Sequence, residues 1–139
     1  MTVPARLSLV TLATPDVERA AAFYERLGWA RSSASVKGEV AFFPLAPGTV
    51  LSLYGGLERD TGVSAPPGAV ALALNCDRPE QVVEVVAAFA DAGGRVVRQT
   101  ATADWGGTTS CVTDLDGHLW EVAHNPGFPL DERGCPQLP

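Results

Sequence analysis

Apolar and polar residues alternate along the chain with different periods, and each change of period marks a predicted element. Residues 5–13 alternate with a period of two, which is typical of a strand. Apolar residues in 15–27 recur at helical spacing, and Gly28 ends this predicted helix. Thr14 is expected to cap the helix, because Pro15 suits the first helical position. Further strands are predicted at 29–36, 39–45 and 49–54.

The same order of elements returns in the second half of the chain. A strand is predicted at 69–75. Asp77–Glu80 has the pattern of a capping box, with Asp77 as the cap of a helix at 78–92. Further strands are predicted at 95–100, 108–113 and 118–123. The chain is therefore predicted to contain two βαβββ modules in tandem.

These elements predict an α+β fold in a single domain that spans 1–139. The first module covers 5–54 and the second covers 69–125. Residues 55–68 have turn composition without periodicity, which favours a linker. Residues 126–139 are rich in proline and glycine and are expected to form a surface tail.

Charge and cysteine content exclude several classes of protein. A formal charge of −6 without any cluster of Lys or Arg argues against a nucleic-acid partner. No apolar run approaches the ~20 residues of a membrane span, and the N-terminus lacks the pattern of a secretory signal. The three cysteines, Cys76, Cys111 and Cys135, form no C-x-x-C pair. We therefore expect a cytoplasmic protein without a disulfide scaffold or a structural zinc site.

Two groups of motifs are specific enough to indicate a family. Thr14–Val17 is followed by Ala22–Trp29, and Gly106–Thr109 is followed by Asp114–Gly117 and Glu121. Together with the duplicated module, they resemble the vicinal oxygen chelate superfamily. That superfamily includes glyoxalase I, extradiol dioxygenases, fosfomycin-resistance enzymes and bleomycin-binding proteins.

The resemblance covers about 5–128, and Leu115 departs from the proline that is usual at its position. It implies that each module curls into a half-barrel of mixed strands with its helix outside, and that the protein is a homodimer. Whether the half-barrels pair within one chain or between chains stays open.

The resemblance also implies where a divalent metal would be held, with one residue from the first and last strand of each module. These positions are Leu9, Ser52, Ala71 (or Val70, one residue away) and Glu121. Only Glu121 is a good donor, whereas a divalent ion needs three or more. His118 and His124 alternate out of phase with Glu121, so both are expected on the opposite face of the strand. We therefore predict no metal cofactor, although acidic loop residues could still complete a site.

The strand face that carries Glu121 is rich in small and polar residues, as expected of a small-molecule cavity. The predicted ligand-binding residues are Thr11, Phe43, Ser52, Tyr54, Ala71, Ala73, Asn75, Trp105 and Glu121. Trp105 could stack on a planar ligand or cover a strand end. The alternative to a ligand cavity is a barrel that Phe42 or Phe43 fills.

The predicted function is metal-free binding of a small organic molecule. Resemblance to the bleomycin-binding branch implies that the protein sequesters a drug or metabolite, with a role in antibiotic resistance. One alternative is a metal-dependent lyase or dioxygenase with a non-standard metal site. Another is a metal-free enzyme with Glu121 as general base. The sequence identifies neither the ligand nor whether the protein is catalytic.

Overall fold

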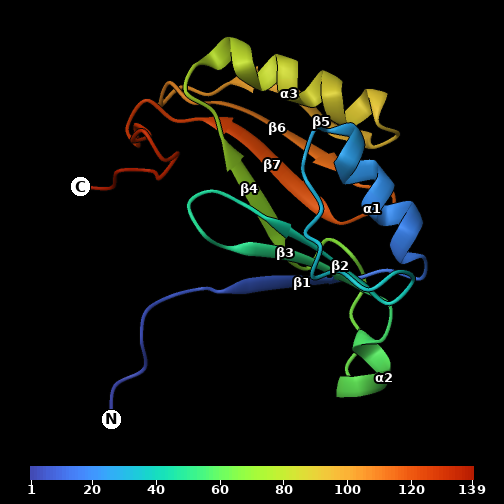
Figure 1. Ribbon diagram of the computed structural model, residues 1–139. Helices are drawn as coiled ribbons and strands as arrows, with labels where there is room; N and C mark the ends of the chain where they lie inside the picture. The colour runs from blue at the N-terminus through green and yellow to red at the C-terminus, as the bar shows by residue number, and fades with distance from the viewer.

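The computed structural model describes residues 1–139 as two sheets with the two longer helices packed against one side of them (Figure 1). The elements are β1 (Leu9–Ala13), α1 (Val17–Arg26), β2 (Val40–Pro44), β3 (Val50–Tyr54), α2 (Leu57–Thr61), β4 (Ala71–Asn75), α3 (Pro79–Asp91), β5 (Arg95–Thr102), β6 (Thr108–Thr113) and β7 (Leu119–His124). Sheet A has the strand order β1-β3-β2, and sheet B has the order β4-β7-β6-β5. The predicted α+β class with mixed strands and outer helices is confirmed, but the sheets do not close into a barrel.

The two modules repeat one strand register. In sheet A, β1 and β3 are parallel, and Thr11 lies opposite Ser52. In sheet B, β4 and β7 are parallel, and Ala73 lies opposite Glu121. Leu9 and Ala71 each lie two residues before the paired position, so they are equivalent in the two modules.

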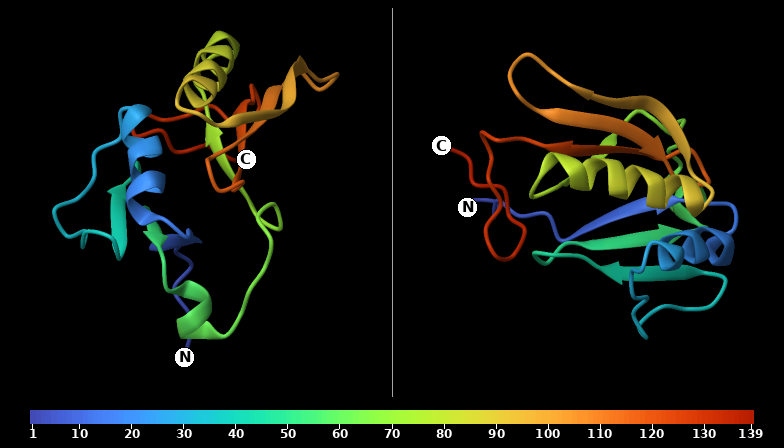
Figure 2. Two further views of the ribbon diagram at one scale, coloured as in Figure 1. Left: turned by 90° about the vertical axis from the view of Figure 1, so that its right-hand side faces the viewer. Right: turned by 90° about the horizontal axis from the view of Figure 1, so that it is seen from above.

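One hydrophobic core joins the two modules. The rings of Phe23 on α1 and Phe89 on α3 meet edge to face with centroids 5.7 Å apart. The Arg26 guanidinium on α1 donates to the carbonyl of Ala92 at the end of α3, with Nη2 2.7 Å away. Figure 2 shows the two helices side by side on the same side of the sheets. The opposite side of each sheet, which we call its open face, is therefore left without a covering layer in a single chain.

Asp114 fastens the β6–β7 hairpin of the second module to the helix of the first. Its carboxylate is 4% exposed and accepts the Tyr24 hydroxyl proton at 2.7 Å and the amides of Asp116 and His118 at 2.9 Å. Tyr24 in turn accepts a hydrogen bond from Trp120 at 3.1 Å. Burial and the neighbouring carboxylate raise the pKa of Tyr24 well above its usual value, so the hydroxyl remains a donor.

The first module differs from the prediction at 29–36, which forms a loop and not a strand. Arg31 holds this loop, because its guanidinium donates to Glu18 and Glu25 on α1 at 2.7 Å each. The Glu18 carboxylate also accepts the amide of Gly38 at 2.9 Å. Tertiary contacts to the helix thus replace the strand, and sheet A has one strand fewer than sheet B.

Both predicted helix caps are displaced. Asp16 caps α1 by accepting the Arg19 amide at 3.0 Å, whereas Thr14 forms a turn just before it. Arg78 occupies the cap position of α3 without a side-chain bond, and the amide of Asp77 donates to Gln81 at 2.9 Å. The predicted linker contains the short helix α2, which the sequence pattern did not indicate. None of the helices is both long and apolar enough to cross a membrane.

Candidate ligand-binding site

A row of four side chains crosses the open face of sheet B. The strand registers place Ala73, Glu121, Cys111 and Arg98 opposite one another on β4, β7, β6 and β5. Ala71 and Asn75 share the face with Ala73, since strand side chains alternate with a period of two. Ala71 and Ala73 are exposed and Glu121 is half-buried. Four of the predicted binding residues lie here together, namely Ala71, Ala73, Asn75 and Glu121, and Trp105 does not.

Arg98 and Cys111 are the two members of this row that the sequence analysis did not predict as binding residues. The Arg98 guanidinium donates to Thr109 Oγ1 at 3.0 Å and to Cys111 Sγ at 3.4 Å. The ion pairs of the chain include neither Arg98 nor Glu121. The open face of sheet B therefore offers a cation and an anion on either side of a thiol.

The reason Arg98 was missed is an irregularity in β5. The register shifts between Val96 and Arg98 and again before Ala101. A bulge of this kind reverses the side of the sheet on which later residues lie, so simple alternation does not identify them.

The open face of sheet A carries Thr11, Ser52 and Phe42, which lie opposite one another on β1, β3 and β2. The prediction that Phe43 binds ligand is wrong in this chain. Phe43 is 0% exposed and packs in the core, with its ring centroid 6.0 Å from that of Tyr24 on α1. One residue of shift along β2 moves a side chain to the other face, and Phe42 is the ring on the open face.

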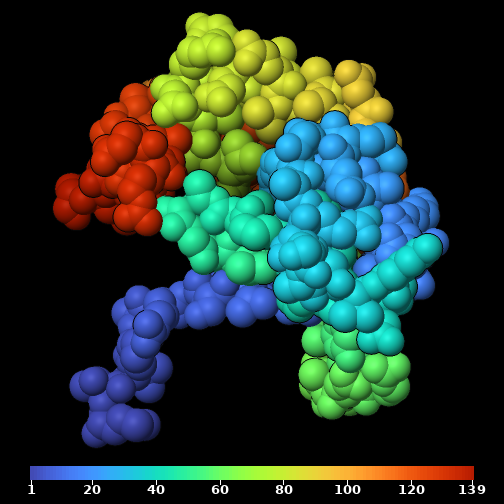
Figure 3. Space-filling model, viewed as in Figure 1, coloured from blue at the N-terminus to red at the C-terminus, as the bar shows by residue number.

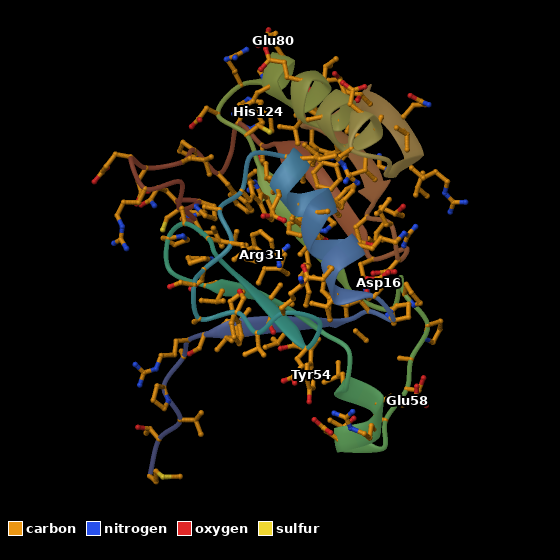
Figure 4. All side chains as sticks on the ribbon, turned by 45° about the vertical axis from the view of Figure 1, so that its right-hand side comes forward. Asp16, Arg31, Tyr54, Glu58, Glu80 and His124 are labelled. Carbon is orange, nitrogen blue, oxygen red and sulfur yellow. The ribbon has the colours of Figure 1, made fainter.

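Tyr54 lies apart from Ser52, at the end of β3. Its hydroxyl donates to the Asp60 carboxylate on α2 and accepts a hydrogen bond from Arg59 at 3.2 Å. The hydrogen bond to Asp60 raises the pKa of Tyr54. Figure 4 shows Tyr54 next to α2 and far from His124. Its polar group is therefore already used to hold α2.

Trp105 lies in the hairpin between β5 and β6, where its side chain is 60% exposed. Its ring lies directly over Gly107, because a Cβ added there would come within 1.7 Å of the ring. Only glycine leaves room for this arrangement. Within one chain, Trp105 therefore covers the hairpin itself.

The donors do not fit a divalent metal within one chain. Of the four positions that the family would use, Leu9 and Ser52 are in sheet A, and Ala71 and Glu121 are in sheet B. No three His, Cys, Asp or Glu side chains are grouped so that they could hold an ion.

The two histidines are also engaged elsewhere. His118 Nε2 lies 2.7 Å from the carbonyl of Ala13, and His124 Nδ1 lies 3.2 Å from the carbonyl of Cys76. Neither lies in the row that contains Glu121. The residue before β4, Val70, lies outside the strand and offers no donor either.

Two hollows of the chain lie away from the row that contains Glu121. One, of about 520 Å³, lies between the linker and the ends of β1, β4 and β7. The other, of about 410 Å³, is lined by Tyr54, Glu39 and Arg59 among others. Neither of these two hollows is lined by Ser52 or Glu121.

Comparison with known proteins identifies the family. The model of the Glyoxalase/Bleomycin resistance protein/Dioxygenase superfamily matches residues 6–122. The chain belongs to this superfamily. Comparison with curated protein sequences gives no match.

Solved structures of the same superfamily are similar along most of the chain. A glyoxalase-related enzyme from Fulvimarina pelagi is 32% identical over 97% of this chain and 99% of its own, with a TM-score of 0.86. A family enzyme from Burkholderia phytofirmans is 16% identical over 86% and 98%, with a TM-score of 0.73. A lactoylglutathione lyase from Agrobacterium tumefaciens is 20% identical over 88% and 96%, with a TM-score of 0.68. The last two similarities establish the shared fold only.

Proposed function

We propose that this protein binds a small organic molecule without a metal ion, in clefts that two copies of the chain form together. The open face of sheet A from one copy would oppose the open face of sheet B from the other. Glu121 and Arg98 would hold polar groups of the ligand, while Thr11, Ser52 and Phe42 would form the opposite wall. By analogy with the bleomycin-binding branch, the role is sequestration of a drug or metabolite in the cytoplasm.

The observation that carries this proposal is that six of the predicted residues lie on the two open faces, namely Thr11, Ser52, Ala71, Ala73, Asn75 and Glu121. α1 and α3 contact each other on the core side of the sheets, which favours open faces that meet a second copy of the chain and not each other. Leu9, at 48% exposure, and the exposed Ala71 and Ala73 leave apolar surface on these faces. Burial of such surface against a second copy is favourable.

A second candidate function is a metal-free enzyme with Glu121 as general base. It is favoured by the 32% identity to a protein described as a glyoxalase-related enzyme. The half-buried Glu121 carboxylate has no ion-pair partner in the chain, so it is free to accept a proton. A metal-dependent lyase or dioxygenase would need donors that the chain does not group together.

The test is a thermal-shift screen of antibiotics and metabolites, with retesting of each hit on two variants. Glu121→Gln keeps the shape of the side chain and removes its charge. Glu80→Gln is the matched control, because Glu80 lies on α3 at the far side of the helices (Figure 4). If the protein sequesters its ligand, Glu121→Gln should lower the affinity for cationic hits about tenfold, and no product should form. If the protein is an enzyme, Glu121→Gln should abolish turnover and leave the affinity for the ligand nearly unchanged.

Two further measurements bear on the proposal directly. Sedimentation should give a dimer at micromolar concentration. Elemental analysis after mild purification should give no stoichiometric metal. One divalent ion per chain, or a screen without a single hit, would contradict metal-free binding.

A further inference from the structure

The hollow of about 520 Å³ beside the linker shares only Thr11 with the residues of the site proposed above. Its floor is formed by residues 11–13 of β1, Leu72 of β4 and residues 118–119 before and in β7. Its walls are α2 and residues 63–70. Of the predicted ligand-binding residues it contains only Thr11, and of the metal positions of the family only Val70, the alternative to Ala71, lines it.

The walls of this cleft are held in place by contacts within the chain. α2 is tied to the end of β3 by the hydrogen bond from Tyr54 to Asp60. On the other side, Pro67 packs on the β6–β7 turn, since a Cβ on Gly117 would lie 3.5 Å from Pro67 Cβ. Pro66 and Pro67 stiffen the linker, because proline fixes one backbone angle. Figure 3 shows α2 standing out from the body below the sheets, and Figure 2 shows the linker returning from it to β4.

The lining is mainly apolar and carries one oriented polar group. The apolar residues include Leu12, Leu57, Val63, Pro66, Leu72 and Leu119. His118 lies among them, with Nε2 2.7 Å from the Ala13 carbonyl. A carbonyl oxygen only accepts, so Nε2 must carry the proton, and Nδ1 of the neutral imidazole is then an acceptor. Glu58 and Thr61 add oxygens to the α2 side.

We propose that this cleft is a second binding site, which takes a small, mainly apolar molecule with one hydroxyl or N–H group. The apolar body lies between the linker and the sheet, and the donor group bonds to Nδ1 of His118. An apolar cavity with few polar groups is the usual form of a small-molecule site, and the fixed tautomer of His118 selects a donor over an acceptor. This site does not depend on the proposed function of the open faces.

The test compares two probes that differ in one hydrogen-bond donor. p-Cresol carries a phenolic hydroxyl, and 4-methylanisole replaces its proton by a methyl group. NMR titration of the labelled protein should show saturable shifts for p-cresol at residues 57–72 and 118–119. p-Cresol should bind about tenfold more tightly than 4-methylanisole, because the ether cannot donate a hydrogen bond to Nδ1 of His118.

His118→Phe should remove this preference and bring the two probes to equal affinity. His124→Phe is the matched control, because His124 bonds to Cys76 outside the cleft, and it should keep the tenfold ratio. Ala65→Trp, in the exposed linker wall, should fill the cleft and abolish binding of both probes.

The comparison of the two probes on the wild-type protein does not depend on whether any variant folds. Absence of saturable p-cresol binding, equal affinities in the wild type, or shifts confined to the neighbourhood of Ser52 and Glu121 would each overturn the proposal. The last result would instead indicate that only the open faces bind small molecules.

Discussion

The two modules share a strand register but differ in what they place on it. Thr11 opposite Ser52 in sheet A is repeated by Ala73 opposite Glu121 in sheet B. Beyond that pair, sheet A continues to Phe42, whereas sheet B continues through Cys111 to Arg98. One open face is therefore neutral and partly aromatic, and the other carries both signs of charge.

This difference shows that the repeat maintains the fold and leaves the chemistry free to diverge. Parallel pairing of the first and last strand fixes which side chains reach each open face. It does not require that they be alike. A cleft made of both faces would have a stacking wall and a charged wall, which suits a ligand with a flat body and polar substituents.

The largest expected effect comes from restoring the missing donors at the equivalent positions. Leu9→His, Ser52→Glu and Ala71→His, combined with the native Glu121, give two imidazoles and two carboxylates. If the open faces oppose each other, this variant should bind Zn²⁺ with a dissociation constant near or below about 1 μM, or about 8 kcal/mol. Calorimetry and elemental analysis should give one ion per chain, and the wild type none.

Half-variants distinguish pairing between chains from pairing within one chain. Leu9→His with Ser52→Glu, and Ala71→His alone, should each bind Zn²⁺ weakly, since neither supplies four donors on its own. Refolding the two half-variants together should create complete sites only if the faces come from different copies. Weak binding by the fully restored variant would show that the faces do not meet.

The next effect concerns the two faces of β2. Phe43→Ala should lower the free energy of unfolding by about 3–5 kcal/mol, because Phe43 is fully buried against Tyr24. Phe42→Ala should cost about 1 kcal/mol or less, because Phe42 lies on the open face, opposite Ser52. Urea denaturation followed by circular dichroism measures both. If Phe43→Ala does not fold, Phe43→Leu should still cost more than Phe42→Leu, and the reverse order would contradict the assignment of faces.

The sequence predicts the fold where the pattern is local and misses what distant contacts decide. Alternation and turn residues identified the strand that carries Glu121, and the duplicated order identified Ser52 as its counterpart. Arg98 was not predicted as a site residue, and a bulge in β5 interrupts the alternation of side chains that could have identified it. The loop that contains Arg31 reads as a strand, because its ion pairs to α1 are invisible in a local pattern. Whether the open faces of the two sheets meet could not be predicted from the sequence, since it depends on how whole sheets are oriented.

The smallest expected effect tests that loop, which is what distinguishes the first module from the second. Hydrogen bonds from Arg31 and from the Gly38 amide lower the pKa of Glu18 below its ordinary value of 4.5. Because the folded pKa is depressed, the stabilisation is present above the ordinary pKa and is lost as the pH falls through the folded value. The Gly38 amide proton shift should therefore titrate below pH 4.5 in NMR spectra.

Glu18→Gln should abolish this titration, because the uncharged amide cannot lose the bond by protonation. Glu25→Gln should leave it in place, since Glu25 bonds to Arg31 but not to Gly38. A titration of the Gly38 shift that survives Glu18→Gln would mean that another acid controls the loop. The strand missing from sheet A would then need a different physical reason, because the contact between α1 and this loop is what substitutes for strand pairing.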